Sequence, residues 1–349
     1  MNFRNYSKLS FVFNLPIIIL LGDNAEGKSN FLESIYFLAT TKSPKAEKED
    51  EIIRYNQDTL HVEGVLDDQT KLEISLQALD EKLKKKVSIN GVSRRVSDYN
   101  LNLAAVLFSP EDINLVIGSP SLRRAHLDQT ISQVDRSYKK AVSDYEGIVT
   151  RKNKILKRIR ESHAKLGELD FWYDQQLLLS SLIVQKREDF FQFINNLEKR
   201  LGQFKFDYLE NQLDAQRLKE YQSREVESAS SLIGPHRDDF TFLKREKEAQ
   251  SDSLSYLDLA KFGSRGEQRT AVLDLKLAEV SFMERYLGSR PVLLLDDIFS
   301  ELDHSHREHV LDISKLQQTI IAAVEIDQSF KKQFQAAQVF KVEKGKISS

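Results

Sequence analysis

Residues Gly22 to Ser29, with the sequence G-D-N-A-E-G-K-S, match the G-x-x-x-x-G-K-[ST] pattern of phosphate-binding loops in full. In such a loop the backbone N–H groups and the N-terminus of the following helix converge on a polyphosphate. Lys28 would neutralise the β and γ phosphates, and the Ser29 hydroxyl would bind Mg²⁺, a hard cation that needs few protein ligands. The residues predicted to hold the nucleotide are Gly22, Asp23, Asn24, Ala25, Glu26, Gly27, Lys28, Ser29 and Asn30.

The elements that flank this loop are the ones a phosphate site requires. Ile17 to Leu21 form an apolar run that predicts a buried strand, and Asn30 to Ala39 predict a helix. A glycine-rich turn with a solvated lysine is the alternative interpretation. That alternative does not require a strand before the loop and a helix after it, so the context favours the phosphate site.

Two adjacent carboxylates follow a second apolar run near the other end of the chain. Val292 to Leu295 predict a buried strand, and the strand ends in Asp296 and Asp297. Asp296 could hold Mg²⁺ through water, as the second acidic element of P-loop NTPases does, and Asp297 could polarise the attacking water. Acidic residues also end strands as turn or cap residues. The interpretation of this pair as metal and water ligands therefore depends on the phosphate loop.

A third stretch, Ser264-Arg265-Gly266-Glu267-Gln268, opens a helix predicted from Gln268 to Tyr286. It would present a hydroxyl, free N–H groups and the positive end of the helix dipole to an anion. An ordinary helix start is the alternative. The segment from Ser300 to Asp303, S-E-L-D, follows the acidic strand and is equally compatible with a capped turn.

Composition limits the class of protein. The 51 Lys and Arg nearly balance the 53 Asp and Glu, so the formal net charge is −2 and any nucleic-acid binding must be local. The absence of cysteine excludes disulfides and thiolate sites and fits a reducing cytosol. Leu15 to Leu21 is far shorter than the ~20 residues of a membrane helix and lacks the features of a secretory signal. We therefore expect a cytoplasmic protein with no membrane partner.

Hydrophobic periodicity divides the chain into regions of different character. The first 110 residues predict strands that are largely antiparallel, with a two-residue hairpin at Asn90-Gly91. Helical periods run from Ser119 to about Leu213, and strand character returns near Ser231 to Leu243. A helix near Ser305 to Ile313 and a strand from Thr319 to Val324 follow.

This order predicts an α/β domain that is split in sequence. We expect residues 1–112 and 214–349 to meet in one domain and residues 113–213 to form an inserted, compact helical arm domain. At 349 residues, the length is compatible with about two domains.

Taken together, the motifs resemble the ABC-type ATPase heads of chromosome-maintenance proteins and, more specifically, the bacterial RecF family of DNA replication and repair proteins. The resemblance covers essentially the whole chain in the family's order. It rests on the motifs above and on five further landmarks: N-F-R-N-Y at 2–6, L-F-S-P-E-D at 107–112, G-S-P at 118–120, R-R at 123–124 and G-P-H-R-D-D at 234–239.

The resemblance implies a mixed sheet with an antiparallel β subdomain and an inserted arm, and an ATP-dependent homodimer. In such heads the signature of one subunit closes on the nucleotide held by the other. Ser264 and Gly266 would then act in trans, beside Lys28 and Asp297 as catalytic residues, with Ser29 and Asp296 at Mg²⁺ and the Ser300 to Asp303 turn communicating across the interface. It further implies a slow, DNA-stimulated ATPase that binds double-stranded and gapped DNA and works with RecO and RecR to load recombinase.

Two departures from the family pattern affect the assignment of residues. Lys45 is followed by Ala46-Glu47, where the family tends to carry arginine and threonine, which weakens the case for a DNA or nucleotide contact there. Ala322-Ala323-Val324 occupies the region where many ABC heads carry a histidine, so no switch histidine is assigned.

Two local excesses of positive charge are candidate DNA contacts. Residues 81–95 carry six basic side chains against one acidic, and residues 139–160 carry eight against two. Phosphate contacts need little sequence specificity, so basic hairpins and arms suffice for duplex binding. A solvated charged face is the alternative for each patch. The candidate residues are Lys84, Lys85, Lys86, Arg94, Arg95, Arg151, Lys152 and Lys154.

Two other functions remain open from the sequence. A P-loop kinase of a small molecule would act as a monomer and leave the Ser264 stretch unexplained. A nonhydrolysing, nucleotide-binding structural protein would not require the intact set of Lys28, Ser29, Asp296 and Asp297.

Overall fold

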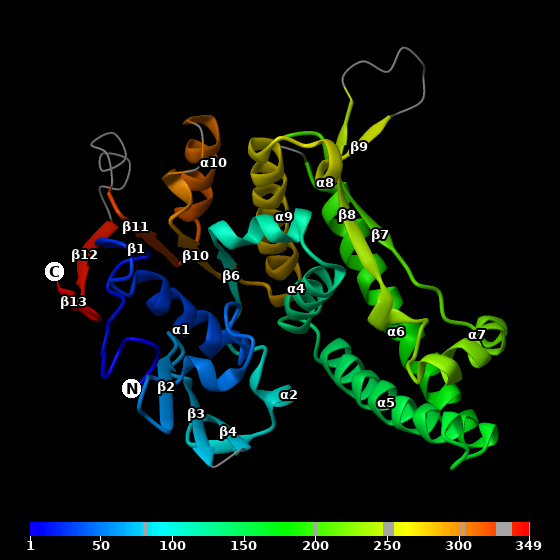
Figure 1. Cartoon of the computed structure of the whole chain (residues 1–349). Coiled ribbons are helices and arrows are strands. Elements are labelled where there is room, and N and C mark those ends of the chain that lie inside the picture. Colours follow the sequence, from blue (N-terminus) through cyan, green and yellow to red (C-terminus); the bar gives the residue numbers. More distant parts are fainter. Residues whose placement is uncertain are drawn as a thin grey trace. The chain divides into compact units, whose positions relative to one another are not determined.

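A computed structural model describes residues 1–79, 82–198, 201–246, 255–300, 302, 304–325 and 337–348 (Figure 1). The chain divides into two compact units, the first formed by Met1–Asp112 with Lys276–Ser349 and the second by Ile113–Leu275. The first boundary coincides with the expected one. The second falls within a helix at 275/276 rather than at 213/214, so residues 214–275 belong to the second unit instead of joining the split domain.

The first unit contains a six-stranded sheet in the order β13-β12-β1-β11-β10-β6, parallel except for β13. The predicted strands before the phosphate loop, at the acidic pair and at Thr319 are confirmed, whereas the hairpin of β12 and β13 is not predicted. The strands are β1 (Ile17–Leu21), β6 (Ala105–Phe108), β10 (Val292–Asp296), β11 (Thr319–Ala323), β12 (Ala337–Glu343) and β13 (Lys346–Ser348).

This sheet is buried on both faces: four consecutive residues of β1, Ile17 to Leu20, are buried, as expected when a parallel sheet is covered on both sides. Ile18 and Leu20 of β1 pack in one core with Leu32 of helix α1 (Lys28–Thr40) and Leu294 of β10, and each of these side chains is fully buried. A short helix, α10 (His304–Ser314), connects β10 to β11. The continuous apolar runs that predicted buried strands therefore reflect this two-sided burial.

The register of the sheet brings the two chemical motifs to the same edge. Leu21 of β1 pairs with Ala323 of β11, and Asp296 of β10 pairs with Ala322 on the other side of β11. Parallel strands end at the same edge, and one intervening strand separates β1 from β10 by about 10 Å. The phosphate loop and the acidic pair, which are more than 260 residues apart in the chain, thus leave the sheet as neighbours.

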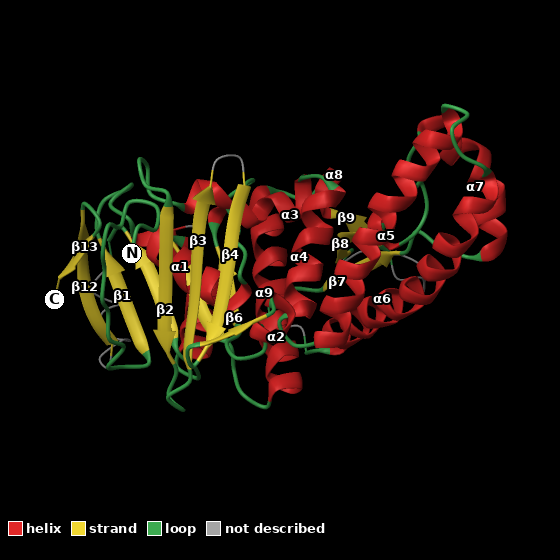
Figure 2. Cartoon of the chain, turned by 90° about the horizontal axis from the view of Figure 1, so that it is seen from below, coloured by secondary structure: helices red, strands yellow, loops and turns green. Residues whose placement is uncertain are grey.

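An antiparallel sheet completes the first unit, in the order β2-β3-β4-β5. Figure 2 shows β2, β3 and β4 side by side. The predicted hairpin turn at Asn90-Gly91 joins β4 to β5, and these two residues adopt φ values of 51° and 76°. The core face of the sheet packs on Phe37 of α1. The strands are β2 (Thr59–Val65), β3 (Lys71–Leu79), β4 (Lys82–Ile89) and β5 (Val92–Arg94), followed by the short helix α2 (Val96–Tyr99).

The second unit consists of long helices and a small sheet. Helices α4 (Pro120–Ser132), α5 (Arg136–Arg160) and α6 (Asp170–Asn196) confirm the predicted helical region, and α5 begins at an N-cap where the Asp135 side chain accepts from the N–H of Tyr138. The prediction of helix up to Leu213 is wrong at its end. Strand β7 (Phe204–Leu209) lies there, with alternating burial, and pairs with β8 (Asp239–Arg245). The remaining elements are α3 (Asn114–Ile117), α7 (Ala215–Ser228), β9 (Tyr256–Asp258), α8 (Leu259–Phe262) and α9 (Arg265–Leu287).

A buried arginine organises the centre of the second unit. The Arg187 guanidinium donates to the Asp238 carboxylate at 2.6 Å, to the Asp128 carboxylate at 2.7 Å and to the Pro235 carbonyl at 2.8 Å. The G-P-H-R-D-D landmark thus supplies buried hydrogen-bonding groups inside this unit. His236 bonds to the Ser231 carbonyl, and burial lowers its pKa to about 4.

None of the helices in the described part of the chain combines the length and the apolar character that a bilayer span requires.

Candidate nucleotide-binding site

The phosphate loop lies between β1 and α1, as predicted. The Lys28 ammonium donates to the Gly22 carbonyl at 2.7 Å and to the Asp23 carbonyl at 2.8 Å, and the Lys28 residue is 6% exposed. The loop therefore curls around its own lysine and holds the charge at the N-terminus of α1. An anion that reaches this end of α1 meets a helix dipole and a fixed ammonium together.

The N-terminal segment supports the loop from one side. The Asn5 amide donates to the Glu26 carbonyl at 3.1 Å, and the Tyr6 hydroxyl donates to the Gly27 carbonyl at 3.0 Å. Gly27 has φ +118°, and a Cβ there would lie 2.5 Å from the Asn5 amide nitrogen. Only glycine fits this position, which accounts for the second glycine of the motif.

The C-terminal hairpin supports the loop from the other side. The N–H of Gly345, in the turn between β12 and β13, donates to the Glu26 carbonyl at 2.9 Å, and the N–H of Lys344 donates to the Glu26 carboxylate. A Cβ on Gly22 would lie 2.3 Å from the Val342 carbonyl oxygen of β12. The sequence offered no signal for this contact, because the two partners lie at opposite ends of the chain.

The two predicted metal ligands are in contact. The Ser29 hydroxyl donates to Oδ1 of Asp296 at 2.7 Å, and the Asp296 residue is 3% exposed. A hydroxyl and a buried carboxylate, both oxygen donors, fit the ligand chemistry of Mg²⁺. Oδ2 of Asp296 accepts from the Lys45 ammonium at 3.1 Å, a contact that the sequence interpretation missed.

Asp297 follows Asp296 in a left-handed conformation with φ 52°, and its N–H donates to the Ala322 carbonyl at 2.9 Å. This backbone geometry turns Asp297 out of the line of β10. Burial raises the pKa of the Asp297 carboxyl, against the opposing effect of the Lys28 ammonium. The Asp297 carboxyl thus lies within electrostatic range of both Lys28 of the phosphate loop and Asp296 at the end of β10.

A cavity of about 850 Å³ adjoins the loop on the side of the N-terminal segment. Its polar side chains offer hydrogen bonds, and the exposed ring of Tyr55 offers a stacking surface. Its lining residues are Arg4, Asn5, Asn30, Lys48, Asp50, Glu51, Ile53 and Tyr55.

The Ser264 stretch caps the N-terminus of α9 in the second unit. The Glu267 carboxylate accepts from the Ser264 N–H at 2.8 Å and from the Ser264 hydroxyl at 2.9 Å, in the pattern of a capping box. Hydrogen bonds from Lys244 and from Ser264 lower the pKa of Glu267 to about 2. Ser264, Arg265 and Gly266 are exposed, and a Cβ on Gly266 would meet no atom within 4 Å. The stretch is thus open to a large partner.

The turn after the acidic strand is described only in part. Ile298–Ser300 form a short 3₁₀ turn and Leu302 is buried. Glu301 and Asp303 lie outside the described residues, so the role assigned to the Ser300 to Asp303 turn stays a prediction.

Comparisons with known proteins agree with this arrangement. The family model "RecF/RecN/SMC N terminal domain" matches residues 1–348. The chain is 33% identical to the DNA replication and repair protein RecF of Agathobacter rectalis, over 99% of this chain and 96% of that protein. It is 34% identical to the RecF protein of Staphylococcus aureus strain N315, over 99% of this chain and 97% of that protein. The chain belongs to the RecF family of DNA replication and repair proteins.

Solved structures extend the likeness to the fold. A structure described as the recombination mediator protein RecF-ATP in the RecFOR pathway has a TM-score of 0.86 and 26% identity, covering 100% of this chain and 95% of that one. The Smc head domain of Pyrococcus furiosus, at 16% identity, has a TM-score of 0.50, covering 99% of this chain and 93% of that one, and shows a related fold. The α/β head class with an antiparallel β subdomain and a helical region, inferred from the sequence, is confirmed.

One of the DNA candidates on β4 is not available to a phosphate. Successive side chains on a strand point to opposite faces, so Lys84 and Lys86 are exposed while Lys85 is turned toward α1. The Lys85 ammonium pairs with Glu49 and donates to the Thr41 carbonyl at 2.9 Å. Lys85 is therefore removed from the candidate DNA contacts.

The prediction of Lys152 as a DNA contact is wrong. The residue belongs to the buried stripe of α5 that includes Tyr145, Ile148 and Leu156, and its ammonium lies 2.8 Å from the Glu225 carboxylate, with both side chains fully buried. Burial lowers the pKa of Lys152, and Glu225 opposes that shift. A lysine in such a position cannot touch DNA, so Lys152 has a structural role.

The other candidates remain accessible. Lys84, Lys86, Arg94, Arg95, Arg151 and Lys154 are all exposed. The Arg151 guanidinium lies 5.6 Å from the ring centre of Trp172, a cation–π contact on the surface of the second unit.

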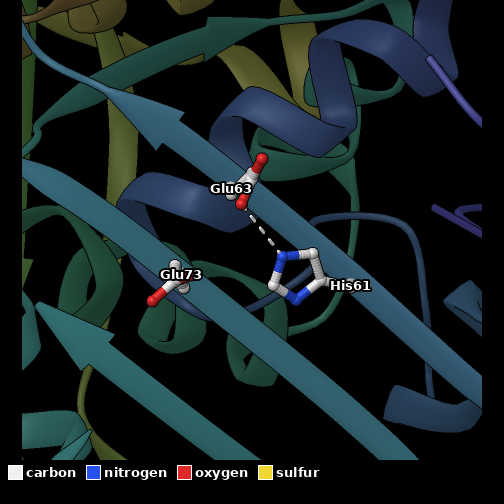
Figure 3. Close-up of side chains that lie close together, drawn as sticks. All are labelled: His61, Glu63 and Glu73. Carbon is white, nitrogen blue, oxygen red and sulfur yellow. Dashed lines mark hydrogen bonds and ion pairs between the residues drawn. The ribbon is translucent and has the colours of Figure 1, made fainter. Parts of the chain in front are cut away.

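One further cluster of metal-ligand types occurs among the described residues, on the outer face of β2 and β3. Figure 3 shows His61 and Glu63 in contact and Glu73 beside them. The Lys71 ammonium lies 3.0 Å from Glu63 and 2.9 Å from Glu73, two carboxylates that are directly opposed across the strands. Lys71 thus already supplies the positive charge that relieves their repulsion, and we interpret the cluster as an ion-pair network.

Gly22→Ala tests the support of the phosphate loop by the C-terminal hairpin. The added methyl group would collide with the Val342 carbonyl, so we expect a loss of about 1–3 kcal/mol in the free energy of unfolding, measured by urea titration. Gly147→Ala is the matched control, because nothing lies within 4 Å of its Cβ position in α5; it should stabilise the protein by up to ~1 kcal/mol. Equal stability of both variants would contradict the contact.

Lys152→Met and Lys154→Met separate burial from DNA binding on one helix. Lys152→Met leaves Glu225 buried without a counter-charge, so it should cost about 3–5 kcal/mol of stability while duplex affinity of the folded protein is unchanged. Lys154→Met should leave stability within about 0.5 kcal/mol of wild type, since the side chain is exposed. Urea unfolding and fluorescence anisotropy with a labelled duplex measure the two effects; weaker DNA binding by folded Lys152→Met would restore that residue as a contact.

Proposed function

We propose that this protein binds Mg·ATP and dimerises around it to clamp DNA, as a slow, DNA-stimulated ATPase of replication and recombinational repair. The contact that carries this proposal is the one between the Ser29 hydroxyl and the buried Asp296 carboxylate, 2.7 Å apart. It places the two halves of a magnesium site next to Lys28. Both side chains offer oxygen ligands of the kind that Mg²⁺ prefers, so their pairing supports a shared metal ligand.

The nucleotide would occupy the loop and the adjoining cavity. Lys28 and the N–H groups of residues 22–30 would hold the phosphates, and the cavity beside Asn5 and Tyr55 has room for the nucleoside. Ser29 and Asp296 would hold Mg²⁺, which offsets the phosphate charge. The RecF-ATP structure, which is similar over the whole of this chain, supports this choice of nucleotide.

Hydrolysis requires a group that orients water. Asp297 turns out of the strand beside Asp296, and it interacts electrostatically with Lys28. We assign it to accept a hydrogen bond from the attacking water. This assignment separates the carboxylate that serves the metal from the one that serves the nucleophile.

Dimerisation would supply the remaining charge stabilisation. The N-terminus of α9 is exposed, carries Arg265, and leaves Gly266 open to close approach. In the free chain the Glu267 carboxylate occupies the Ser264 donors. The γ-phosphate held by a second copy would compete for these donors, so we propose that Ser264 and Gly266 act in trans.

The proposed DNA and protein partners are based on membership of the RecF family rather than on the geometry of the site. We propose double-stranded or gapped DNA as the ligand of the exposed basic residues on β4 and α5, with Lys84, Lys86 and Lys154 among the contacts. RecO and RecR are the proposed protein partners, in the cytoplasm. The similar solved structures are described as belonging to the RecFOR pathway.

Sedimentation with and without Mg·ATP and duplex DNA tests the dimer. Wild type should shift from monomer to dimer with ATP. Asp297→Asn should also dimerise, and more persistently, because ATP hydrolysis falls by about 10²–10⁴-fold when the water-orienting carboxylate is lost. Ser264→Arg should bind ATP as a monomer and fail to dimerise, because its side chain fills the space that a second subunit needs. Wild type that stays monomeric at saturating Mg·ATP, even with DNA, would refute the clamp and favour a small-molecule kinase.

Lys28→Ala tests the nucleotide site itself. Loss of a charge-assisted contact to the phosphates should weaken ATP binding by roughly 10- to 100-fold, measured by isothermal titration calorimetry. Lys42→Ala, an exposed lysine just beyond α1, is the charge-matched control and should bind as wild type does. Unchanged affinity of Lys28→Ala would remove the loop from the nucleotide site.

A further inference from the structure

Lys45 is the cation that neutralises the predicted metal-binding carboxylate. Its ammonium lies 3.1 Å from Oδ2 of Asp296, while Ser29 donates to Oδ1. The Asp296 side chain is 4% exposed, whereas that of Lys45 is 28% exposed. A buried carboxylate without a counter-charge is strongly unfavourable, and Lys45 supplies that charge from the surface side.

The backbone near Lys45 is anchored, so the contact does not depend on a loose side chain alone. The Ser43 hydroxyl accepts from the N–H of Lys45 at 3.0 Å and donates to the buried Glu33 carboxylate of α1 at 2.5 Å. Glu33 is in turn held by two hydrogen bonds from Arg4, at 2.7 and 3.0 Å. The ammonium of Lys45, by contrast, has a second carboxylate within reach, because Glu111 lies 3.8 Å away.

An ammonium and a divalent cation cannot share Oδ2 of Asp296. Both carry positive charge, and the low exposure of the carboxylate strengthens their repulsion. A cation that arrives without phosphates would have to displace Lys45 with only Ser29 and Asp296 as protein ligands. A cation that arrives with a triphosphate brings compensating negative charge and further oxygen ligands.

We propose that Lys45 is a built-in counter-ion that makes metal binding at Asp296 conditional on the nucleotide. In the free protein Lys45 neutralises Asp296 and excludes divalent cations. When the nucleotide and its metal bind, the Lys45 ammonium leaves Asp296, and Glu111 can receive it. The proposal rests on the proposed function for the identity of the site but concerns the nucleotide-free protein, so the two are tested separately.

Mn²⁺ binding to the full chain without nucleotide tests the inference, with free Mn²⁺ followed by electron paramagnetic resonance. Lys45→Met should bind Mn²⁺ roughly tenfold or more tightly than wild type, because the competing charge is gone. Lys45→Gln keeps a polar side chain and should show the same gain if the methionine variant folds poorly. Lys45→Arg keeps the charge and should behave as wild type.

Two controls assign the effect to Asp296. Lys42→Met removes the same charge from the same exposed segment and should leave Mn²⁺ binding unchanged. Lys45→Met combined with Asp296→Asn should lose the gained affinity. Wild-type affinity in both Lys45→Met and Lys45→Gln, an equal gain in Lys42→Met, or a gain that survives Asp296→Asn would overturn the proposal.

A separate titration distinguishes this result from failure of the proposed function. Wild type that does not bind Mg·ATP would refute the nucleotide site, whatever Lys45 does. Wild type that binds Mg·ATP, together with Lys45 variants that bind Mn²⁺ no better than wild type, would refute only the counter-ion.

Discussion

The buried carboxylate of Asp296 is the constraint on which the site depends. It ends β10 one strand away from the loop that follows β1, and its two oxygens accept from Ser29 and Lys45. A carboxylate with so little exposure needs a positive charge and hydrogen-bond donors close by. The residues around Asp296 therefore serve charge and hydrogen bonding rather than packing. The parallel register of β1, β11 and β10 makes this compensation possible, because it brings both motifs to one edge of the sheet.

The rest of the first unit keeps the phosphate loop rigid. Asn5 and Tyr6 bond to its carbonyls from the N-terminal side, and Gly345 bonds to the Glu26 carbonyl from the C-terminal hairpin. Loop carbonyls satisfied in this way do not need to rearrange when a polyphosphate arrives. Part of the ordering cost of binding is therefore met during folding.

The second unit is held by buried charges rather than by apolar contacts alone. Arg187 joins Asp128 to Asp238, and Lys152 joins α5 to Glu225 of α7. Each pair is expensive to break, because one unpaired charge would stay behind in the interior. Such pairs fix which helix faces meet, and they leave the capped N-terminus of α9 as the exposed chemical feature proposed to meet a second copy.

Local patterns were enough to predict most elements and the position of the phosphate-loop motif between a strand and a helix. The eight residues from Gly22 to Ser29, the apolar runs around them and the Asn90-Gly91 turn act through short-range chemistry that the sequence displays directly. The pairing of Ser29 with Asp296 was predicted as a common metal site only because each motif is recognisable alone. The spacing of Tyr145, Ile148, Lys152 and Leu156 at three and four residues was the signal that Lys152 faces inward, although its charge suggested a surface.

Amino-acid sequence by itself determined the chemistry of each motif and the type of most elements, because hydrogen-bonding groups and periodicity are local properties. Only the tertiary structure decided which lysine neutralises Asp296 and which glycine lies against the C-terminal hairpin. It also decided which basic residues are exposed to solvent and where the second unit ends. Those outcomes depend on contacts between Lys45 and Asp296, Gly22 and Val342, and Lys152 and Glu225, which lie far apart in the chain. The neighbouring sequence does not indicate these contacts, because the distance between the partners and their burial are set by the packing of the whole domain.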